Sequence, residues 1–260
     1  MILQNLNRIG GIGLVVRFLL FKLLTRLGLK ALSPYAATYS QLFNGKNGIE
    51  IGGPSAIFNQ LPVYSSLNSI DGCNYSTSTV WEGQIKEGEL YRIGDKTGYQ
   101  YIAEASDLSK IPDNKYDFLI SSHCLEHCAN ALKTVQEWVR VVKPGGIVLM
   151  ILPNKNFTFD HNRNLTTFDD LVSDFNQNIG EDDLTHLEEI LALHDLEMDK
   201  QAGTKEEFKA RSLNNKENRC LHHHVFDLDL LEKSFDFCGV ATIHRELIMP
   251  YHQIIIGRKN

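Results

Sequence analysis

The sequence has little of what marks a secreted, membrane-spanning or nucleic-acid-binding protein. Its five cysteines are an odd number without the spacing of a disulfide framework, which indicates a reducing compartment. The apolar stretch Ile12 to Leu24 is interrupted by Arg17 and Lys22, so it is too short to span a bilayer, and no small-residue cleavage site follows it. The net charge of −6 disfavours nucleic acid as a partner. We therefore expect a cytoplasmic protein.

Acidic residues are absent from residues 1–49, which contain six basic residues. The remaining chain carries 20 basic and 32 acidic residues, a balance of −12. Residues 1–40 are therefore predicted to be a separate basic, amphipathic helical segment, broken at Ser33-Pro34. One hypothesis is a helix that covers a cleft or docks on a partner in a homodimer. The other is that residues 1–30 lie on an anionic membrane surface, giving a membrane-associated protein.

The stretch from Tyr116 to Pro153 predicts a strand, a helix and a second strand. Phe118 to Ile120 is an apolar run too short for a helix. Apolar residues then recur at three- and four-residue steps from Leu132 to Val142, until the sequence KPGG ends the helix. Ile147 to Leu152 is again apolar and rich in branched residues. Two strands that are apolar on both faces, joined by a helix, are a crossover unit of a parallel sheet.

This order of YDFLISS, LEH, helix, KPGG and strand resembles the fourth and fifth strand units of class I S-adenosylmethionine-dependent methyltransferases. The resemblance covers roughly residues 45–155, and the last thirty residues more loosely. It implies an α/β fold with a doubly wound, seven-stranded, mostly parallel sheet whose final strand inserts antiparallel. Residues 41–157 and 223–260 would form this Rossmann-like core, and residues 158–222 a helical cap insertion.

A glycine turn follows the first predicted strand in the sequence NGIEIGGP. Such a turn brings backbone close to a ligand at the carboxyl end of a strand. The resemblance assigns cofactor binding here to Glu50, Gly52 and Gly53. Pro54 departs from the family pattern, in which another glycine is usual, and it offers no N–H group.

Acidic residues after the second and third predicted strands are candidates for binding the adenosine part of S-adenosylmethionine. Asp71 comes 19 residues after Gly52, a spacing typical of a ribose-binding carboxylate, with Glu82 as its rival. The resemblance implies an adenine contact for Asp107, with Leu108 packing on the ring. Alternatively, Asp107 caps a helix.

Polar residues after the fourth and fifth strands should face the ligand, because both strands end at the same edge of the sheet. Ser121 and Ser122 are predicted to contact the cofactor. A hydroxyl acceptor needs a base to remove its proton, and histidine has a suitable pKa. His161 is our first candidate for this catalytic base, followed by His123 and His127.

Two groups of histidines raise the question of a metal. His123 and His127 would share one helical face, and Cys124 and Cys128 would share another at the same spacing, but single cysteines on helices are usually buried hydrophobes. His222 and His224 point the same way in an extended segment and are open to metal, substrate or structural roles. Because no third ligand is evident, we predict no metal. The predicted substrate-binding residues are Asp160, Arg163, His222 and His224.

We therefore expect a methyltransferase that moves the methyl group of S-adenosylmethionine to a small-molecule acceptor by O-methylation. The predicted cap and the LPNK…FDHNR loop resemble the family at a general level. This resemblance favours a hydroxyl of a sugar or sugar nucleotide as the acceptor, in polysaccharide or natural-product biosynthesis. One alternative is an NAD-type Rossmann enzyme, which the lack of a G-x-G-x-x-G turn disfavours. Another is a catalytically inactive methyltransferase-fold binding module, which Pro54 motivates.

Overall fold

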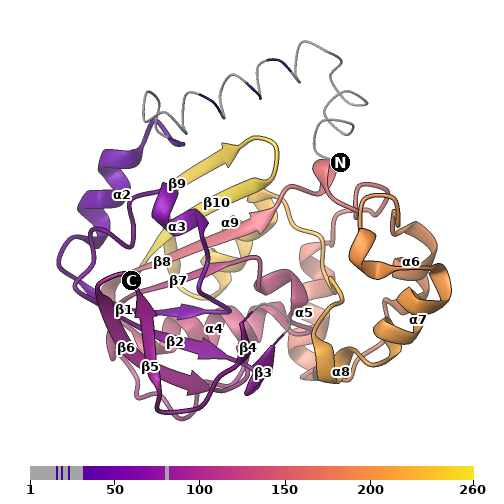
Figure 1. The fold of residues 1–260 in the computed structure, drawn as a ribbon, viewed down its shortest axis with the longest axis horizontal. Coiled ribbons are helices and arrows are strands. Elements are labelled where there is room, and N and C mark those ends of the chain that lie inside the picture. Colours follow the sequence, from indigo (N-terminus) through magenta and orange to yellow (C-terminus); the bar gives the residue numbers. More distant parts are fainter. Residues whose placement is uncertain (1–15, 17–18, 20–22, 24–31, 80–81) are drawn as a thin grey trace.

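An eight-stranded sheet forms the centre of the molecule (Figure 1). The computed structural model describes residues 16, 19, 23, 32–79 and 82–260. The strand order is β5-β6-β2-β1-β7-β8-β10-β9, and a separate small sheet joins β3 to β4. The strands are β1 (Asn47–Ile51), β2 (Ser69–Asn74), β3 (Ser78–Thr79), β4 (Gly83–Gln84), β5 (Leu90–Ile93), β6 (Lys96–Ile102), β7 (Tyr116–Ser122), β8 (Val142–Pro153), β9 (Val240–Ile248) and β10 (His252–Lys259).

The topology is that of a doubly wound α/β fold. Strands β6, β2, β1, β7 and β8 run parallel, and β10 lies antiparallel between β8 and β9. The predicted antiparallel insertion of the last strand is thus confirmed. The strand count of seven needs a correction to eight, because Leu90–Ile93 folds back on β6 as an antiparallel edge strand. A tight turn at Gly94, whose φ is +60°, makes this hairpin.

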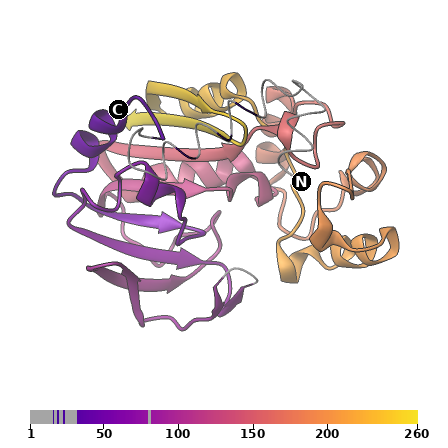
Figure 2. The same cartoon turned by 45° about the horizontal axis from the view of Figure 1, so that its top comes forward.

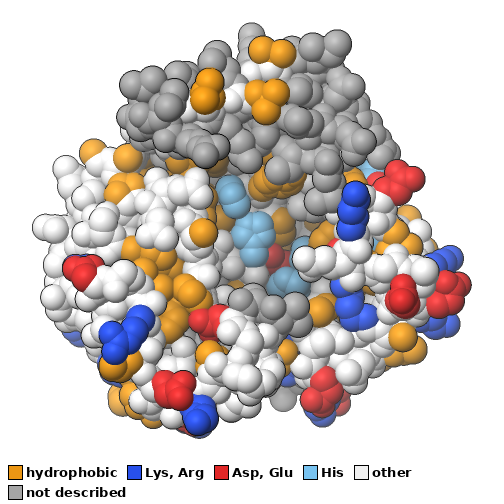
Figure 3. Space-filling view, in the orientation of Figure 1, with side chains coloured by type: hydrophobic (Ala, Val, Ile, Leu, Met, Phe, Trp, Pro, Cys, Tyr) orange, Lys and Arg blue, Asp and Glu red, His pale blue; other side chains and the backbone are white. Residues whose placement is uncertain are grey.

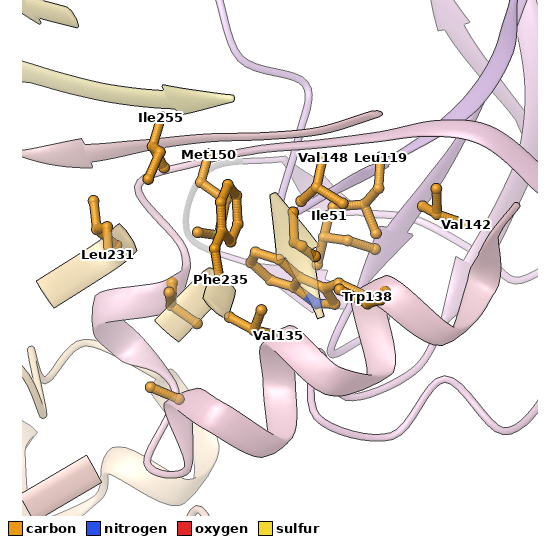
Figure 4. Packing of buried hydrophobic residues seen from close by; sticks show 14 of the residues in the cluster. Ile51, Leu119, Val135, Trp138, Val142, Val148, Met150, Leu231, Phe235 and Ile255 are labelled. Atoms are coloured by element: carbon orange, nitrogen blue, oxygen red, sulfur yellow. The ribbon is translucent and has the colours of Figure 1, made fainter. Parts of the chain in front are cut away.

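Helices cover both faces of the sheet. Alternate residues of the central strands point to opposite sides, so Leu119 and Val148 belong to one hydrophobic core and Phe118 and Ile147 to the other. The first core packs under Trp138 (Figure 4). Its helices are α4 (Ala131–Val141), α5 (Phe168–Gln177) and α9 (Leu228–Phe237). The second core is covered by α2 (Ala36–Phe43) and α3 (Ile57–Gln60).

A small helical unit stands beside the sheet and contributes one wall of a cavity. It consists of α6 (Leu187–Leu193), α7 (Lys205–Leu213) and α8 (Asn215–Asn218) and has its own hydrophobic cluster around Ile190 and Phe208 (Figures 1 and 2). A Thr204–Glu207 capping box starts α7. The insertion predicted as one cap over residues 158–222 therefore has two parts. The helices α6, α7 and α8 form the small unit, whereas α5 packs on α4 and α9 in the main core.

The predictions for residues 1–30 lie almost entirely outside the described residues. Of that segment only Val16, Leu19 and Leu23 are described, and all three are helical with exposed apolar side chains. Within the part of the chain that the structure describes, none of the helices has the length and apolar character needed to cross a membrane. Membrane contact and dimerisation remain predictions.

Candidate active site

A cavity of about 580 Å³ lies between the carboxyl ends of the strands and the cap. Figure 3 shows the hollow in the middle of one face, with histidine side chains gathered in it. The sheet side is lined by residues that follow β1, β2, β6 and β7, where doubly wound folds bind their ligands. Its lining residues include Gly52, Pro54, Ser55, Asn74, Tyr75, Glu104, Ala105, Ser122, His123, His127, Phe159, Glu181, Asp199, Gln201, Arg211, Arg219 and His222.

The glycine turn reaches the cavity through Gly52. Its φ of +75° is left-handed, and a Cβ atom there would lie 3.2 Å from Cys124. Glu50 and Gly53 do not line the cavity. Glu50 is fully buried behind the turn, where its carboxylate accepts hydrogen bonds from the Ser55 N–H (2.9 Å) and from the hydroxyls of Tyr64 (2.6 Å) and Tyr91 (2.8 Å). Glu50 therefore braces the turn, and Gly53 is required because a Cβ would lie 2.1 Å from the Glu50 Cδ atom.

The ribose-binding expectation for Asp71 needs correction. Strand β2 continues past Asp71 to Asn74, so Asp71 lies opposite Ile49 inside the sheet and away from the cavity. Its carboxylate already accepts from the Tyr99 N–H (2.8 Å), the Tyr116 hydroxyl (2.6 Å) and the Lys115 ammonium (3.1 Å). Because Asn74 stands at the true end of β2, it occupies the place expected of the ribose ligand. The rival Glu82 lies behind it and accepts a hydrogen bond from the Asn74 amide.

The adenine-binding expectation for Asp107 and Leu108 also needs correction. Strand β6 ends at Ile102, and the cavity is lined by Glu104 and Ala105 instead. Asp107 is exposed and accepts from the Ser109 N–H (3.1 Å) in a local turn. Residues 108–115 contain turns and not a helix, so the alternative role as a helix cap is wrong as well. Leu108 is fully buried in the main core. Glu104 is thus the acidic residue after β6 that lines the cavity.

The two serines after the fourth strand have different roles. Ser121 is buried, and its hydroxyl donates to the carbonyl of Ile51 (3.1 Å), which ties β7 to the end of β1. Ser122 lines the cavity together with His123, whose φ of +53° turns it out of the strand. His123 Nε2 lies 3.2 Å from Nδ1 of His252. Burial in the cleft, with the histidines His252 and His222 nearby, lowers the pKa of His123.

The structure places His161, the first candidate for the base, outside the cavity. Its Nε2 is 2.9 Å from Oδ2 of Asp195, so the imidazole joins the loop after β8 to the segment after α6. A base has to reach the acceptor, and the histidines that line the cavity are His123, His127 and His222. We therefore move the proposed base away from His161.

Asp160 and Arg163 form a buried ion pair that holds His222 in place. Arg163 Nη1 is 3.2 Å from Oδ1 of Asp160 and 2.7 Å from the His222 carbonyl. Asp160 Oδ2 is 2.5 Å from Nδ1 of His222. Although burial alone would raise it, contact with His222 and Arg163 lowers the pKa of Asp160 to about 2. Neither Asp160 nor Arg163 lines the main cavity, so of the four predicted substrate-binding residues only His222 does.

His127 and His224 face different surroundings. His127 lines the cavity, and its Nδ1 lies 3.0 Å from the Leu221 carbonyl. His224 is buried outside the cavity, with Nε2 3.0 Å from the Ala129 carbonyl. Cys124 and Cys128 are free thiols that flank the 3-10 helix Leu125–His127 and line the cavity, so the expectation of two cysteines on one helix is wrong.

Sequence reasoning missed the residues that the cap contributes. Asp199 and Arg219 come from the connections of the cap helices and Arg211 from α7, and no local motif marks them. Arg219 Nη2 reaches across the cavity to Oε1 of Glu104 at 2.5 Å. Glu104 could have been found as the first acidic residue after the third strand, had the end of that strand been known.

Comparisons with known proteins agree with this geometry. Residues 56–150 match a family model described as a methyltransferase domain. A solved S-adenosylmethionine-dependent methyltransferase from Mesorhizobium loti is 11% identical, with a TM-score of 0.51 over 88% of this chain and 98% of that chain. One from Methanosarcina mazei is 16% identical, with a TM-score of 0.49 over 88% and 99% of the two chains. A comparison with curated protein sequences finds no match.

A third solved structure is the 1,6-didemethyltoxoflavin-N1-methyltransferase from Burkholderia thailandensis, which contains 1,6-didemethyltoxoflavin and S-adenosylhomocysteine. It is 10% identical, with a TM-score of 0.46 over 88% of this chain and 78% of that chain. At 11% identity the Mesorhizobium loti structure shows the fold alone, and the family model identifies residues 56–150 as a methyltransferase domain. The match over residues 56–150 agrees with the predicted resemblance to class I S-adenosylmethionine-dependent methyltransferases. The cofactor of this family is S-adenosylmethionine.

Proposed function

We propose that the protein transfers the methyl group of S-adenosylmethionine to a hydroxyl of a sugar or sugar nucleotide. The observation that carries this proposal is the composition of the one cavity described above. Its sheet side presents the cofactor-binding strand ends, and its inner wall presents three imidazoles. Its volume of about 580 Å³ falls within the range of about 300–1,000 Å³ typical of small-molecule sites.

The adenosine part of the cofactor is proposed to lie along the ends of β1, β2 and β6. Asn74 would bind the ribose hydroxyls, and Glu104 would accept a hydrogen bond from the adenine amino group with Ala105 against the ring. Gly52 lets the turn after β1 approach the methionine part, and Ser122 lies on the same side. This assignment keeps the ribose and adenine contacts that the family resemblance implies. It moves the ribose contact from Asp71 to Asn74 and the adenine contact from Asp107 to Glu104, which both line the cavity.

The acceptor is proposed to lie between the histidines and the cap. The cap wall presents Asp199, Gln201 and Arg211, a set of donors and acceptors suited to several hydroxyls. Arg211 and Arg219 can also bind the phosphates of a sugar nucleotide. Methyl transfer is an in-line displacement at the methyl carbon with sulfur as the leaving atom, so the site contributes mainly by holding the acceptor oxygen, the methyl group and the sulfur in line. A hydroxyl oxygen must also lose its proton, for which the histidine-lined wall provides acceptors.

An acceptor screen tests this proposal. The protein would be incubated with S-adenosylmethionine and matched pairs of free sugars and their nucleotide diphosphates, and S-adenosylhomocysteine release would be measured. We expect release above the acceptor-free baseline with at least one sugar or sugar nucleotide, and a raised KM for the nucleotide form in Arg211→Gln. A protein that binds the cofactor but methylates only amines, thiols or carbon acceptors would contradict the proposed acceptor class.

A further inference from the structure

Glu126 is a carboxylate that the proposed reaction does not use and that forms an ion-pair contact, Nδ1 of His123 to Oε1 at 3.7 Å, without a hydrogen bond. It lies in the short 3-10 helix Leu125–His127 after β7, and its side chain is 1% exposed. Among the described residues, neither of its oxygens has a hydrogen-bond partner. Burial of a carboxylate that accepts no hydrogen bond costs free energy, which a bound proton or a bound cation would offset.

Two histidines near Glu126 each have Nδ1 in contact with an oxygen atom. Nδ1 of His127 faces the Leu221 carbonyl at 3.0 Å, and Nδ1 of His222 faces Oδ2 of Asp160 at 2.5 Å. With Nδ1 engaged, Nε2 is the nitrogen left to bind a ligand on each ring. Histidines that bind metals are held in this way, with the other ring nitrogen donating to a carbonyl or a carboxylate.

The three side chains can reach one cation. Glu126, His127 and His222 each offer one ligand atom, and these atoms all lie within 4.8 Å of one another. Two imidazoles and one carboxylate form a ligand set of catalytic zinc, which keeps a further coordination position open. His127 and His222 both line the cavity, so the open position would face the acceptor.

We propose that Glu126, His127 and His222 bind one divalent transition-metal ion of the zinc class, which coordinates the acceptor hydroxyl beside the methyl donor. This role rests on the methyl transfer proposed above. The bound cation lowers the pKa of the hydroxyl, whose proton leaves to solvent. The alkoxide oxygen then forms the new C–O bond, the S–CH₃ bond breaks, and its electron pair stays on the sulfur of S-adenosylhomocysteine. Asp160 acts as a positioning residue that fixes the ring of His222.

A second cluster provides a matched control. Asp174, His186 and His224 also bring one ligand atom each within 4.8 Å, away from the main cavity. Glu126→Gln and Asp174→Asn therefore make the same acid-to-amide change in two clusters of similar composition. Thermal unfolding of both variants identifies any that does not fold.

The experiment measures zinc directly and separately from activity. The protein would be stripped with a chelator, and zinc would be titrated back by calorimetry and counted by mass spectrometry. We expect one zinc ion per chain in the parent and in Asp174→Asn. In Glu126→Gln zinc affinity should fall by about 100-fold or more, since even changes around the ligands weaken binding about 10–100-fold. A parent that takes up no zinc at micromolar concentration, or a loss in Asp174→Asn alone, overturns the assignment.

Cofactor binding on the same samples separates this inference from the proposed function. We expect S-adenosylhomocysteine to bind the stripped protein, and chelation to lower kcat by at least tenfold with recovery on adding zinc. Zinc uptake without any S-adenosylhomocysteine binding would support the ion site while overturning the methyl-transfer role. Unchanged methyl transfer after chelation would overturn the proposed role of the metal and leave the proposed function standing.

Discussion

Replacing Glu104 should weaken cofactor binding, whereas replacing Asp107 should not. Both residues follow β6, but Glu104 lines the cavity and Asp107 is exposed in a local turn. Arg219 occupies Oε1 of Glu104, which leaves Oε2 to accept from the adenine amino group. A hydrogen bond to a charged acceptor contributes about 1.5–3 kcal/mol, so Glu104→Ala should raise the Kd for S-adenosylhomocysteine roughly 10- to 150-fold.

Calorimetric titration of the parent, Glu104→Ala and Asp107→Ala with S-adenosylhomocysteine measures this difference. Thermal unfolding of the three proteins controls for a loss of fold, because Glu104→Ala also removes the ion pair with Arg219. The Kd of Asp107→Ala should stay within about twofold of the parent. If Asp107→Ala weakens binding tenfold while Glu104→Ala does not, the adenine site lies where the sequence first indicated, and our reassignment is refuted.

Two further changes test residues outside the cavity. His161→Ala removes a partly buried contact with Asp195, so it should lower the Tm by about 2–4 °C for a loss near 1 kcal/mol and leave kcat unchanged. A large fall in kcat at an unchanged Tm would return His161 to the role of base. Glu50→Gln should gain stability relative to the parent as the pH rises, because burial raises the pKa of Glu50 from 4.5 to about 7. The folded parent then binds more protons than the unfolded chain between those pH values, so it loses up to about 3 kcal/mol over that window. Urea unfolding at pH 5 and pH 8 checks this, and a constant difference between the two proteins would contradict it.

The fold could be predicted further than the site. The apolar runs and the KPGG helix stop predict β7, α4 and β8 because burial on both faces leaves a strong local pattern. The exact end of a strand leaves no such pattern, since hydrogen bonding to neighbouring strands decides it. Asp71 and Asp107 were predicted from distances along the chain, and two strand ends shifted by a few residues moved both away from the cavity.

The cap shows a second limit of local patterns. His161 lies in a polar loop of the kind that often carries function, yet a contact with Asp195, 34 residues later, takes its side chain away from the acceptor. The pairing of Arg219 with Glu104 spans 115 residues and joins the cap to the sheet. Such contacts depend on how the cap docks, which is a tertiary property without a sequence motif.

Binding of S-adenosylhomocysteine to the unmodified protein is the most direct test of the central claim. Calorimetry at pH 7.5 should show one site per chain, with displacement by S-adenosylmethionine and none by NAD. Because the glycine turn, Asn74 and Glu104 all line one cavity, binding should be saturable at micromolar ligand. No heat of binding at millimolar S-adenosylhomocysteine, in a sample that unfolds cooperatively, would contradict the account and favour a methyltransferase fold that has lost its cofactor.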